Sequence, residues 1–485
     1  MKAFGNIAKD GQVRAVASGA LTDGTAVIVN ADGTVSVVSG QDEGSGSSTN
    51  ISTDSGLSSP QAVYDPDTGK VVIAYHRDAN PYYGAAIVGT VDTSDNSISF
   101  GSVVKFKPND TDGCQDLTMV YDTNADKILI VYGDKNNSKY GTAIVGTISG
   151  TSISFGTAVV FTSRGIRDHD SEFDSNSNKI LVSYYSNFPH SIVATISGTS
   201  VSFGTKAAIS EGNIRKFGMA FSTSANKFVL VYPDNDQSLH AQYIVATISG
   251  TNVSYGTEGN LNSCSTDEVR ITYDASLDKF LAVYYDNDDS AKGKARVGTL
   301  SGTTVSWGTI AVFHDAATLF PDVETDGSGN FIISYCDDAD SDKMKFLSAT
   351  VSGTNVSFGS DNVIDTVDSA SGAAEGQSGM AYDSANGKFV IPYQDQTNTI
   401  LKAKVLQLGS TNITSENFIG FSDGAFATTQ SAAINTTNTI DRNQSGLTAG
   451  QTYFVQTDGT LGLTAADPSV TAGTAISATE LIVKG

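Results

Sequence analysis

The sequence predicts an all-β protein, a seven-bladed β-propeller with small β modules at its two ends. Three observations support this fold class. Between Tyr64 and Gly359 the chain repeats one strand-rich pattern six times, at intervals of about fifty residues, and then starts a seventh. Several strand segments are apolar on both faces, and the segments between them are rich in Gly, Ser, Thr, Asn and Asp. Charged residues are sparse, at 17%, and we find no helical periodicity of useful length.

Two landmarks define the register of the repeat. Each unit closes on Ser-aromatic-Gly, with the aromatic residue at Phe100, Phe155, Phe203, Tyr255, Trp307 and Phe358. Each unit opens with a strand that ends on Tyr-Asp or an equivalent pair, whose first residue is Tyr64, Tyr121, Phe173, Phe221, Tyr273, Glu324 and Tyr382. Seven openings predict seven blades, because strand-rich units of this length usually stack into a closed propeller.

The second repeat illustrates how one unit forms a blade. We expect strands at residues 117–121, 127–132, 141–148 and 152–160, with a polar turn at 122–126. In the second strand, Ile and Tyr on one face alternate with Leu and Val on the other, so both faces must be covered. Neighbouring blades provide that cover. A Ser-Gly turn suits the last hairpin because glycine tolerates positive φ, and we expect the closing aromatic ring to pack between blades.

The repeats divide the chain into three parts. We expect an N-terminal β-hairpin segment at 1–45, the propeller at 46–411 and a C-terminal small β module at 412–485. The seventh repeat lacks an obvious fourth strand. Either residues 412–414 or the strand-like segment at 34–38 could supply it, and the second is favoured because it would tie the ring shut.

The two ends of the chain resemble each other. Residues 20–35 align without gaps on 446–461, and each stretch indicates a β-hairpin with an Asp-Gly tip. Together with residues 417–421 and 472–484, these hairpins resemble modules of tail-fibre-like virion proteins of tailed bacteriophages, especially marine ones. The resemblance covers most of the C-terminal module and, loosely, the N-terminal hairpin. It implies a virion structural or adhesion protein, names no receptor and carries no catalytic residues.

Composition excludes several partners. The formal net charge of −23 argues against nucleic-acid phosphate and against an anionic membrane, since both require a basic surface. The N-terminus lacks the apolar core of a signal peptide, and no apolar run is long enough to cross a membrane. Cys114, Cys264 and Cys336 lie in different repeats without ligand spacing, which argues against a disulfide framework and a zinc site.

Loop variation indicates the functional face. The turns after the first strands and the Ser-Gly-Thr turns repeat closely, whereas the loops after the second strands and the links between blades vary. Function concentrates on loops held by a rigid frame, so we expect binding on the variable face. Candidate sugar contacts there, each of which could instead be a packed loop anchor, are Tyr82, Tyr83, Phe188, His190, Phe217 and Phe320. The charged residues expected at the channel mouth are Asp116, Asp168, Asp170, Lys216, Glu268, Arg270 and Asp322.

Acidic residues recur after the second strands. The repeated positions are Asp134, Asp234, Asp286, Asp337 and Asp395. These carboxylates either cap their own turns or form a ring that binds Ca²⁺ or a cationic ligand. Capping is favoured, because carboxylates on different blades lie too far apart to share one ion. The acidic runs at 286–289 and 337–342 leave weak Ca²⁺ binding open, and no other cofactor is expected.

The leading hypothesis is a non-enzymatic virion structural protein, such as a tail fibre, that presents the propeller to a host-surface glycan or protein. Its expected partners are other virion proteins and further copies of itself, in a particle assembled in the host cytoplasm. One alternative is a polysaccharide depolymerase that uses Asp116, Asp168 or Glu268 as paired acids. The other alternative is a passive decoration protein of the capsid or neck.

Overall fold

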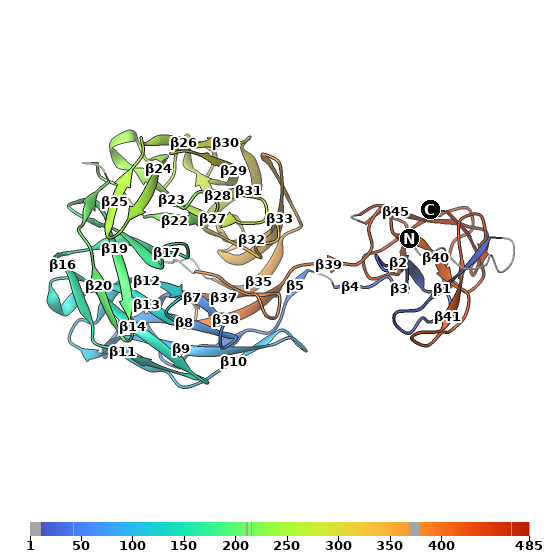
Figure 1. The fold of residues 1–485 in the computed structure, drawn as a ribbon, viewed down its shortest axis with the longest axis horizontal. Helices are drawn as coiled ribbons and strands as arrows, with labels where there is room; N and C mark the ends of the chain where they lie inside the picture. The colour runs from blue at the N-terminus through green and yellow to red at the C-terminus, as the bar shows by residue number, and fades with distance from the viewer. Residues whose placement is uncertain are drawn as a thin grey trace. The chain divides into compact units, whose positions relative to one another are not determined.

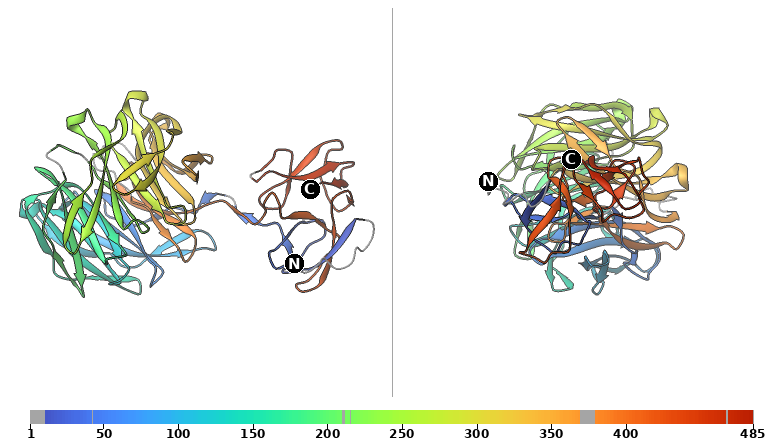
Figure 2. Two further views of the ribbon diagram at one scale, coloured as in Figure 1. Left: turned by 45° about the horizontal axis from the view of Figure 1, so that its top comes forward. Right: turned by 90° about the vertical axis from the view of Figure 1, so that its right-hand side faces the viewer.

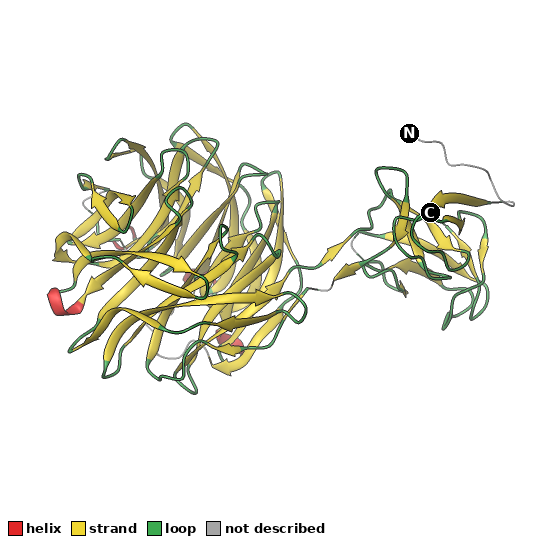
Figure 3. Cartoon of the chain, turned by 60° about the horizontal axis from the view of Figure 1, so that its bottom comes forward, coloured by secondary structure: helices red, strands yellow, loops and turns green. Residues whose placement is uncertain are grey.

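The computed structural model of the chain describes residues 11–41, 43–209, 212–214, 216–368, 379–466 and 468–484. Regular structure in these ranges is almost entirely strand (Figure 3). The helices described there are 3₁₀ turns of three residues each: η1 (Lys135–Asn137), η2 (Asn235–Gln237), η3 (Asn287–Asp289) and η4 (Asp338–Asp340). The all-β prediction is therefore confirmed. None of these described helices has the length or apolar character needed to cross a membrane.

The chain forms two compact units. The repeat domain spans Ser45–Gln407, and the terminal domain combines Met1–Gly44 with Leu408–Gly485. The repeat domain is built from antiparallel sheets that share one plan. In the first sheet, the strands β7 to β10 follow one another and β11 pairs with the other end of β9: β7 (Leu57–Asp65), β8 (Lys70–Arg77), β9 (Tyr82–Asp92), β10 (Ser97–Phe100) and β11 (Val104–Asp110).

The next three sheets repeat this order. The second sheet holds β12 (Cys114–Asp122), β13 (Lys127–Asp134), β14 (Tyr140–Ser149), β15 (Ser152–Phe155) and β16 (Val159–Gly165). The third holds β17 (Arg167–Asp174), β18 (Lys179–Ser186), β19 (Phe188–Ser197), β20 (Ser200–Phe203) and β21 (Ala207–Ala208). The fourth holds β22 (Gly218–Ser222), β23 (Lys227–Asp234), β24 (His240–Ser249), β25 (Asn252–Tyr255) and β26 (Gly259–Ser265).

One long strand joins the fifth and sixth sheets. The fifth holds β27 (Val269–Asp274), β28 (Lys279–Asp286), β29 (Lys292–Ser301) and β30 (Thr304–Trp307). The sixth holds β32 (Asn330–Asp337), β33 (Lys343–Ser352), β34 (Asn355–Phe358) and β35 (Asn362–Asp368). Strand β31 (Ala311–Thr325) pairs with β29 through its first half and with β32 through its second half.

The first strands of the sheets contact one another in a cyclic order. Each of β7, β12, β17, β22, β27 and β31 contacts the first strand of the next sheet, and β36 (Ala381–Asp383) contacts both β31 and β7. The seventh and first sheets are also joined by a backbone hydrogen bond of 3.1 Å from Ala62 N–H to Gly379 O. Figure 1 shows the sheets following one another around a common centre, and Figure 2 shows them from two other sides. This repeated architecture is compatible with the predicted propeller.

The seventh sheet takes its outer strand from the N-terminal side of the repeat domain. Its strands β36, β37 (Lys388–Asp395) and β38 (Ile400–Gln407) are followed by β5 (Gly44–Ser45) and β6 (Thr49–Asn50). Neither segment proposed from the sequence fills this place. Residues 34–38 contribute β3 to a terminal-domain sheet, and Ile413 lies in the terminal-domain core. Both proposed segments already have apolar partners there, whereas residues 44–50 are too small and polar to signal a strand.

The second strands are buried on both faces, as the sequence predicts. In β13, Ile128 and Ile130 pack in one hydrophobic cluster with residues of the first sheet. Leu129 and Val131 pack in another cluster with residues of the third sheet. The Tyr that begins each Tyr-x-Asp or equivalent ending is fully buried in every sheet: Tyr75, Tyr132, Tyr184, Tyr232, Tyr284, Tyr335 and Tyr393.

The glycine after the closing aromatic residue lies close to the backbone of the adjacent sheet in several repeats. A Cβ atom on Gly156 would overlap the carbonyl oxygen of Thr199 in the next sheet. The same overlap with a neighbouring carbonyl would occur at Gly46, Gly101, Gly204 and Gly308. The Ser-aromatic-Gly ending therefore needs glycine for close approach rather than for an unusual φ. Gly46 extends the pattern to the seventh sheet, where it faces the Asn96 carbonyl of the first.

Replacing this glycine should destabilise the repeat domain. We expect Gly204→Ala to lower the free energy of unfolding by about 1–3 kcal/mol, because the new methyl group must push the neighbouring backbone away. Urea unfolding measures the change. The control is Ser202→Ala, an exposed residue of β20, the strand that ends directly before Gly204. Equal stability of the two variants would contradict the close-approach explanation.

Both ends of the chain build the terminal domain together. One sheet has the order β1 (Gln12–Val16), β41 (Ser431–Asn435), β40 (Phe418–Ser422), β2 (Ala26–Val29) and β3 (Val35–Val37). A second sheet has the order β42 (Ile440–Asp441), β46 (Leu481–Val483), β45 (Val470–Ala475), β43 (Thr452–Val455) and β44 (Leu461–Gly462). Strand β4 (Gly40–Gln41) pairs with β39 (Ser410–Thr411). The segments 1–45 and 412–485, which we described separately from the sequence, thus share one sheet and one hydrophobic core.

The two hairpins predicted at the ends are present. Strand β2 pairs with β3, and β43 pairs with β44. In both turns an Asp carboxylate accepts a hydrogen bond of 2.9 Å from the backbone N–H two residues later, Asp32 from Thr34 and Asp458 from Thr460. The glycine between them has a φ of 82° in one hairpin and 87° in the other, which explains the matching Asp-Gly-Thr sequences.

Candidate functional site

An irregularity at the start of the first strands positions several predicted site residues. The pairing of the first and second strands slips between Gln115 and Leu117, and similar shifts occur in the first, third and sixth sheets. A residue with positive φ lies at this place in several repeats: Ser59, Asp116, Asp168, Lys216 and Phe320, with φ between 35° and 52°. Bulges of this kind redirect a side chain away from the regular alternation of a strand. Four of the predicted site residues, Asp116, Asp168, Lys216 and Phe320, therefore occupy one repeated structural position.

Three of the predicted residues line one cavity, which we call the mouth pocket. Asp168, Lys216 and Phe320 border a space of about 520 Å³. The remaining lining residues are Arg167, Asn213, Asn235, Asp267 and Tyr285. The lining thus combines two aromatic rings, two carboxamides, two carboxylates and two cations. Such a mixture suits a polar, uncharged ligand with an apolar face.

A buried carboxylate organises the cations beside the mouth pocket. Glu268 is only 1% exposed, and its two oxygens lie 3.2 Å from Lys216 Nζ and 3.1 Å from Arg270 Nη2. Arg270 also donates a 2.7 Å hydrogen bond to the carbonyl oxygen of Phe217. Lys216 Nζ lies 5.4 Å from the centre of the Phe320 ring. Because Glu268 holds Lys216 in place, the ammonium and the ring reach the pocket in a defined arrangement.

A second cation on the pocket wall is also held by its neighbours. Arg167 forms an ion pair with Asp168. Its guanidinium carbon lies 4.1 Å from the centre of the Tyr185 ring, and 46% of its side chain remains exposed. The Arg167 guanidinium is therefore exposed to solvent, while the Tyr185 ring and the Asp168 carboxylate hold it in position.

Two of the predicted contacts belong to the hydrophobic core instead. Tyr83 is 1% exposed and donates a 2.6 Å hydrogen bond from its hydroxyl to Asp54. Phe217 is 2% exposed and packs edge-on against the Tyr232 ring. In the sequence, both residues look like loop residues. In the structure, Tyr83 lies at the start of β9 and Phe217 directly precedes β22, and both rings are buried. They offer no surface to a ligand.

The other predicted residues lie outside the mouth pocket. His190 is buried, stacks on Tyr184 and contacts the Phe188 carbonyl oxygen through Nδ1 at 2.8 Å, and burial lowers the pKa of its imidazole. Phe188 itself is 47% exposed on the third sheet. Tyr82 is partly exposed at the start of β9. Asp116 is partly buried and accepts a hydrogen bond of 3.3 Å from Gln115.

Sequence reasoning missed most of the pocket wall. Tyr285 occupies the middle position of Tyr-x-Asp, which differs between repeats and points away from the buried Tyr284. Variation at that position is a signal that could have identified it. Asn213 and Asn235 come from two loops that meet through a backbone hydrogen bond of 2.9 Å, and no sequence pattern links them.

A second cavity, the channel cavity, lies along the first strands. It measures about 600 Å³, and five carboxyl groups line it. Asp326 caps its own turn by accepting hydrogen bonds from Ser328 and Asn330. The other four, which we call the channel carboxyls, are Asp170, Glu172, Asp322 and Glu324. Asp170 accepts a 3.1 Å hydrogen bond from Met219 N–H, and Asp322 accepts one of 3.2 Å from Met380 N–H. Each of these two residues thereby ties its own sheet to the next.

The pairing of β31 with β32 corrects the register of the sixth repeat. Thr325 pairs with Phe331 as Tyr121 pairs with Ile128, so Thr325 and not Glu324 takes the place of the repeated Tyr. Glu324 therefore occupies a channel-facing position. The sequence misled us because this repeat has neither Tyr nor Phe at the landmark.

Burial dominates the titration of the channel carboxyls. It raises the pKa of Glu324 to about 8 and that of Asp322 to about 6. It also raises the pKa of Asp170, and it raises that of Glu172 well above its ordinary value, where the charges of Asp170 and Glu324 add to the effect. Arg270 partly offsets the shift at Asp170 and Asp322. The cavity thus holds carboxyl groups that are costly to ionise without a cation.

The Glu324 shift predicts how stability depends on pH. Because the folded-state pKa lies above the ordinary 4.5, the folded state binds the extra proton. The stabilisation from this proton is fully present below about pH 4.5 and is lost as the pH rises through about 8. Glu324→Gln should therefore gain stability relative to the parent protein across this window and keep the gain above it. Urea unfolding at a series of pH values measures the difference.

The matched control for this experiment is Asp112→Asn, an exposed carboxylate of the same domain. Its stability should follow that of the parent protein at every pH. Parallel curves for Glu324→Gln and the parent protein would contradict the assignment of a buried, protonated carboxyl group.

The repeated Asp after the second strand caps its own turn, as favoured from the sequence. Asp134, Asp234 and Asp286 each accept a hydrogen bond from the N–H two residues later, Asp337 from Ala339 and Asp340, and Asp395 from Asn398. Several also pair with a lysine, for example Asp286 with Lys294 at 2.6 Å. Within the described ranges, no three His, Cys, Asp or Glu side chains are grouped to hold a metal ion.

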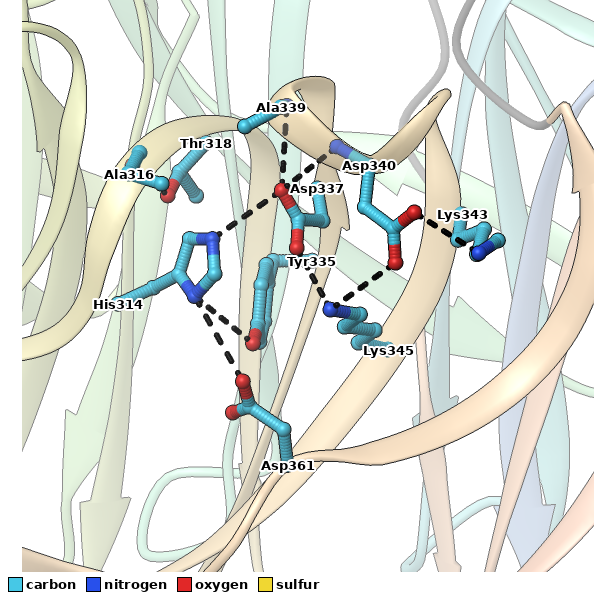
Figure 4. A network of polar contacts seen from close by, with 10 residues as sticks. All are labelled: His314, Ala316, Thr318, Tyr335, Asp337, Ala339, Asp340, Lys343, Lys345 and Asp361. Atoms are coloured by element: carbon cyan, nitrogen blue, oxygen red, sulfur yellow. Dashed lines mark hydrogen bonds and ion pairs between the residues drawn. The ribbon is translucent and has the colours of Figure 1, made fainter.

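The cap of the sixth sheet is the centre of a larger polar network (Figure 4). Asp337 lies 2.6 Å from Lys345 Nζ and 3.2 Å from His314 Nε2. The other ring nitrogen of His314 lies 3.2 Å from the Tyr335 hydroxyl and 3.7 Å from Asp361. Within the acidic run at 337–342, Asp337 and Asp340 are thus paired with Lys343 and Lys345 of the same sheet.

Comparisons with known proteins identify no family. No protein-family model matches the chain, and no curated protein is recognisably similar to it. A protein of unknown function from Dyadobacter fermentans has a TM-score of 0.43 at 10% identity, covering 74% of this chain and 98% of its own. A Bacteroides uniformis protein, named provisionally as a 6-phosphogluconolactonase, has a TM-score of 0.45 at 9% identity. This match covers 63% of the present chain and 85% of the Bacteroides chain. Likeness at this level carries no functional argument.

Proposed function

We propose that the repeat domain is a closed seven-bladed β-propeller. The cyclic contacts between first strands support this, together with the hydrogen bond between Ala62 and Gly379. The addition of β5 and β6 to the seventh sheet supports closure as well, because strands from both ends of the domain then share one sheet. Closure in this way hides sheet edges that would otherwise invite aggregation.

The chain is, in this proposal, a phage virion structural protein, a tail fibre or similar appendage, that displays the propeller for recognition of a host-surface glycan. The resemblance of the end segments to tail-fibre-like modules supports a place in the virion. Those segments belong to one terminal domain, from which the chain leaves and returns through the paired strands β4 and β39. The proposed partners of the terminal domain are other virion proteins and further copies of the chain.

The mouth pocket is the observation that carries the recognition role. Phe320 supplies ring surface for the apolar face of a sugar, since Tyr285 is only 8% exposed, and Asn213, Asn235 and Asp267 supply donors and acceptors for its hydroxyl groups. The balance of charges on the pocket wall favours a neutral glycan over a strongly anionic one. The pocket lies among the variable loops, where recognition surfaces differ between relatives.

Binding without cleavage is part of the proposal. A hydrolase would need a pair of carboxyl groups that can exchange protons with the substrate. Both oxygens of Glu268 contact cations, and Asp168 is paired with Arg167. No contact in the mouth pocket therefore favours the depolymerase alternative over a binding role.

Glycan binding can be tested on a microarray of bacterial surface glycans, followed by titration of the bound glycan. We expect Phe320→Ala and Asn213→Ala to weaken binding about tenfold each, equivalent to about 1.4 kcal/mol, because each removes a pocket contact. Phe188→Ala removes an exposed aromatic residue outside the pocket and should leave the affinity unchanged.

Two results would overturn this proposal. If no glycan on the microarray binds the protein, the result would favour a decoration protein that contacts only other virion proteins. Release of reducing sugar from a bound polysaccharide would favour the depolymerase.

A further inference from the structure

We propose that the channel cavity binds an organic cation, an ammonium group that enters past a ring of aromatic side chains and is held by the channel carboxyls. This inference concerns residues other than those of the mouth pocket and does not rest on the proposed glycan binding. Four observations carry it: the position of the carboxyls, their lack of a cationic partner, the aromatic rim and the size of the cavity.

The carboxyls come from only two of the sheets and lie on the channel side of both. Asp170 and Glu172 are alternate residues of β17, and Asp322 and Glu324 are alternate residues of β31, so each pair points the same way. The charge of Glu324 acts on Glu172, which brings the two pairs into one electrostatic group across the channel.

The protein provides three of these carboxyls with hydrogen bonds, from Met219 N–H to Asp170, from Met380 N–H to Asp322 and from Thr325 N–H to Glu324, but it provides no ion pair among the described residues. The cationic side chain that lines the cavity, among the residues described, is Arg270. Its guanidinium donates to the Phe217 carbonyl oxygen and to Glu268, which lies toward the mouth pocket. No Lys or Arg of the described ranges forms an ion pair with any of the four channel carboxyls. Glu172 forms no hydrogen bond with another described residue, although it is partly buried and lines the cavity.

Aromatic residues surround the same cavity at the other end of the first strands. Tyr64, Tyr121, Phe221, Tyr273 and Tyr382 all line it. These side chains come from five different sheets, because they occupy the repeated Tyr position just before the first turn. Aromatic faces attract ammonium groups, above all when the site is shielded from water.

The combination selects an organic cation rather than a metal ion. Metal ions such as Ca²⁺ need several oxygen ligands around one point, and the described acidic side chains form no such group. A volume of about 600 Å³ is larger than a bare ion requires and lies within the range of small-molecule sites. A quaternary or primary ammonium compound can contact the rings and the carboxyls together.

Proton release should accompany binding. Burial raises the pKa of Glu324 to about 8, so this carboxyl group carries a proton at neutral pH in the empty cavity. An ammonium group favours the ionised carboxylate and displaces that proton. Affinity should therefore rise with pH up to about 8.

Isothermal titration of the full chain with choline chloride, repeated with butylammonium chloride, tests the proposal. Measurements in two buffers of different ionisation enthalpy report the protons released. We expect at least one of the two compounds to bind and release a proton, and we expect Glu172→Gln and Glu324→Gln to weaken its binding at least about tenfold. In Glu324→Gln the proton release should also decrease, because one of the carboxyl groups with a raised pKa has been removed. Asp112→Asn, an exposed carboxylate in the same domain, and Phe320→Ala in the mouth pocket should bind like the parent protein.

Thermal unfolding of each variant shows whether it is folded. Glu324→Gln should be at least as stable as the parent protein near pH 8, because the substitution removes a carboxyl group whose pKa is raised by burial. Failure of both ammonium compounds to bind above and below this pH would overturn the proposal. Binding of Ca²⁺ or K⁺ that displaces choline would overturn it in favour of an inorganic ion. Loss of choline binding in Phe320→Ala would move the cation site to the mouth pocket.

Discussion

The repeat domain depends on the burial of its second strands on both faces. Ile128 and Ile130 pack toward one neighbouring sheet, while Leu129 and Val131 pack toward the other. No sheet of this kind has a stable surface of its own, so a row of them would leave an apolar face bare at each end. Contact between β36 and β7 removes both bare faces. The glycine after each closing aromatic residue follows from the same constraint, because adjacent backbones come too close there for a side chain.

This packing also decides where polar chemistry can occur. The middle of each second strand is apolar on both faces, whereas residues of the first strands line the channel cavity and include its carboxyl groups. Regular alternation places Asp170 and Glu172 toward that cavity, while the irregularity before them directs Asp168 to the mouth pocket. One strand therefore serves two sites with different chemistry. In the mouth pocket, the two cations are paired with carboxylates, Arg167 with Asp168 and Lys216 with Glu268. In the channel cavity, the channel carboxyls form no ion pair with a Lys or Arg of the described residues.

The structure of the terminal domain explains why the two ends of the chain have similar sequences. Hairpins with the same Asp-Gly-Thr turn belong to two different sheets of one domain, and their apolar residues share a core, as Ile28 and Val455 do. Neither hairpin could bury its apolar face alone. In the chain, the repeat domain is thus inserted between the two halves of the terminal domain.

The sequence by itself determined the all-β class, the repeat boundaries, the two-sided burial and the capping Asp residues, because each rests on a local pattern of apolar alternation or turn chemistry. It also identified Asp168, Lys216 and Phe320, whose places before the first strands can be counted from the repeat. Only the tertiary structure decided that residues 44–50 complete the seventh sheet, that Tyr83 and Phe217 are buried, and that Asn213 and Asn235 join the pocket wall. These outcomes depend on contacts between segments distant in the chain, and on a change of backbone direction at one positive φ, which no run of neighbouring residues encodes.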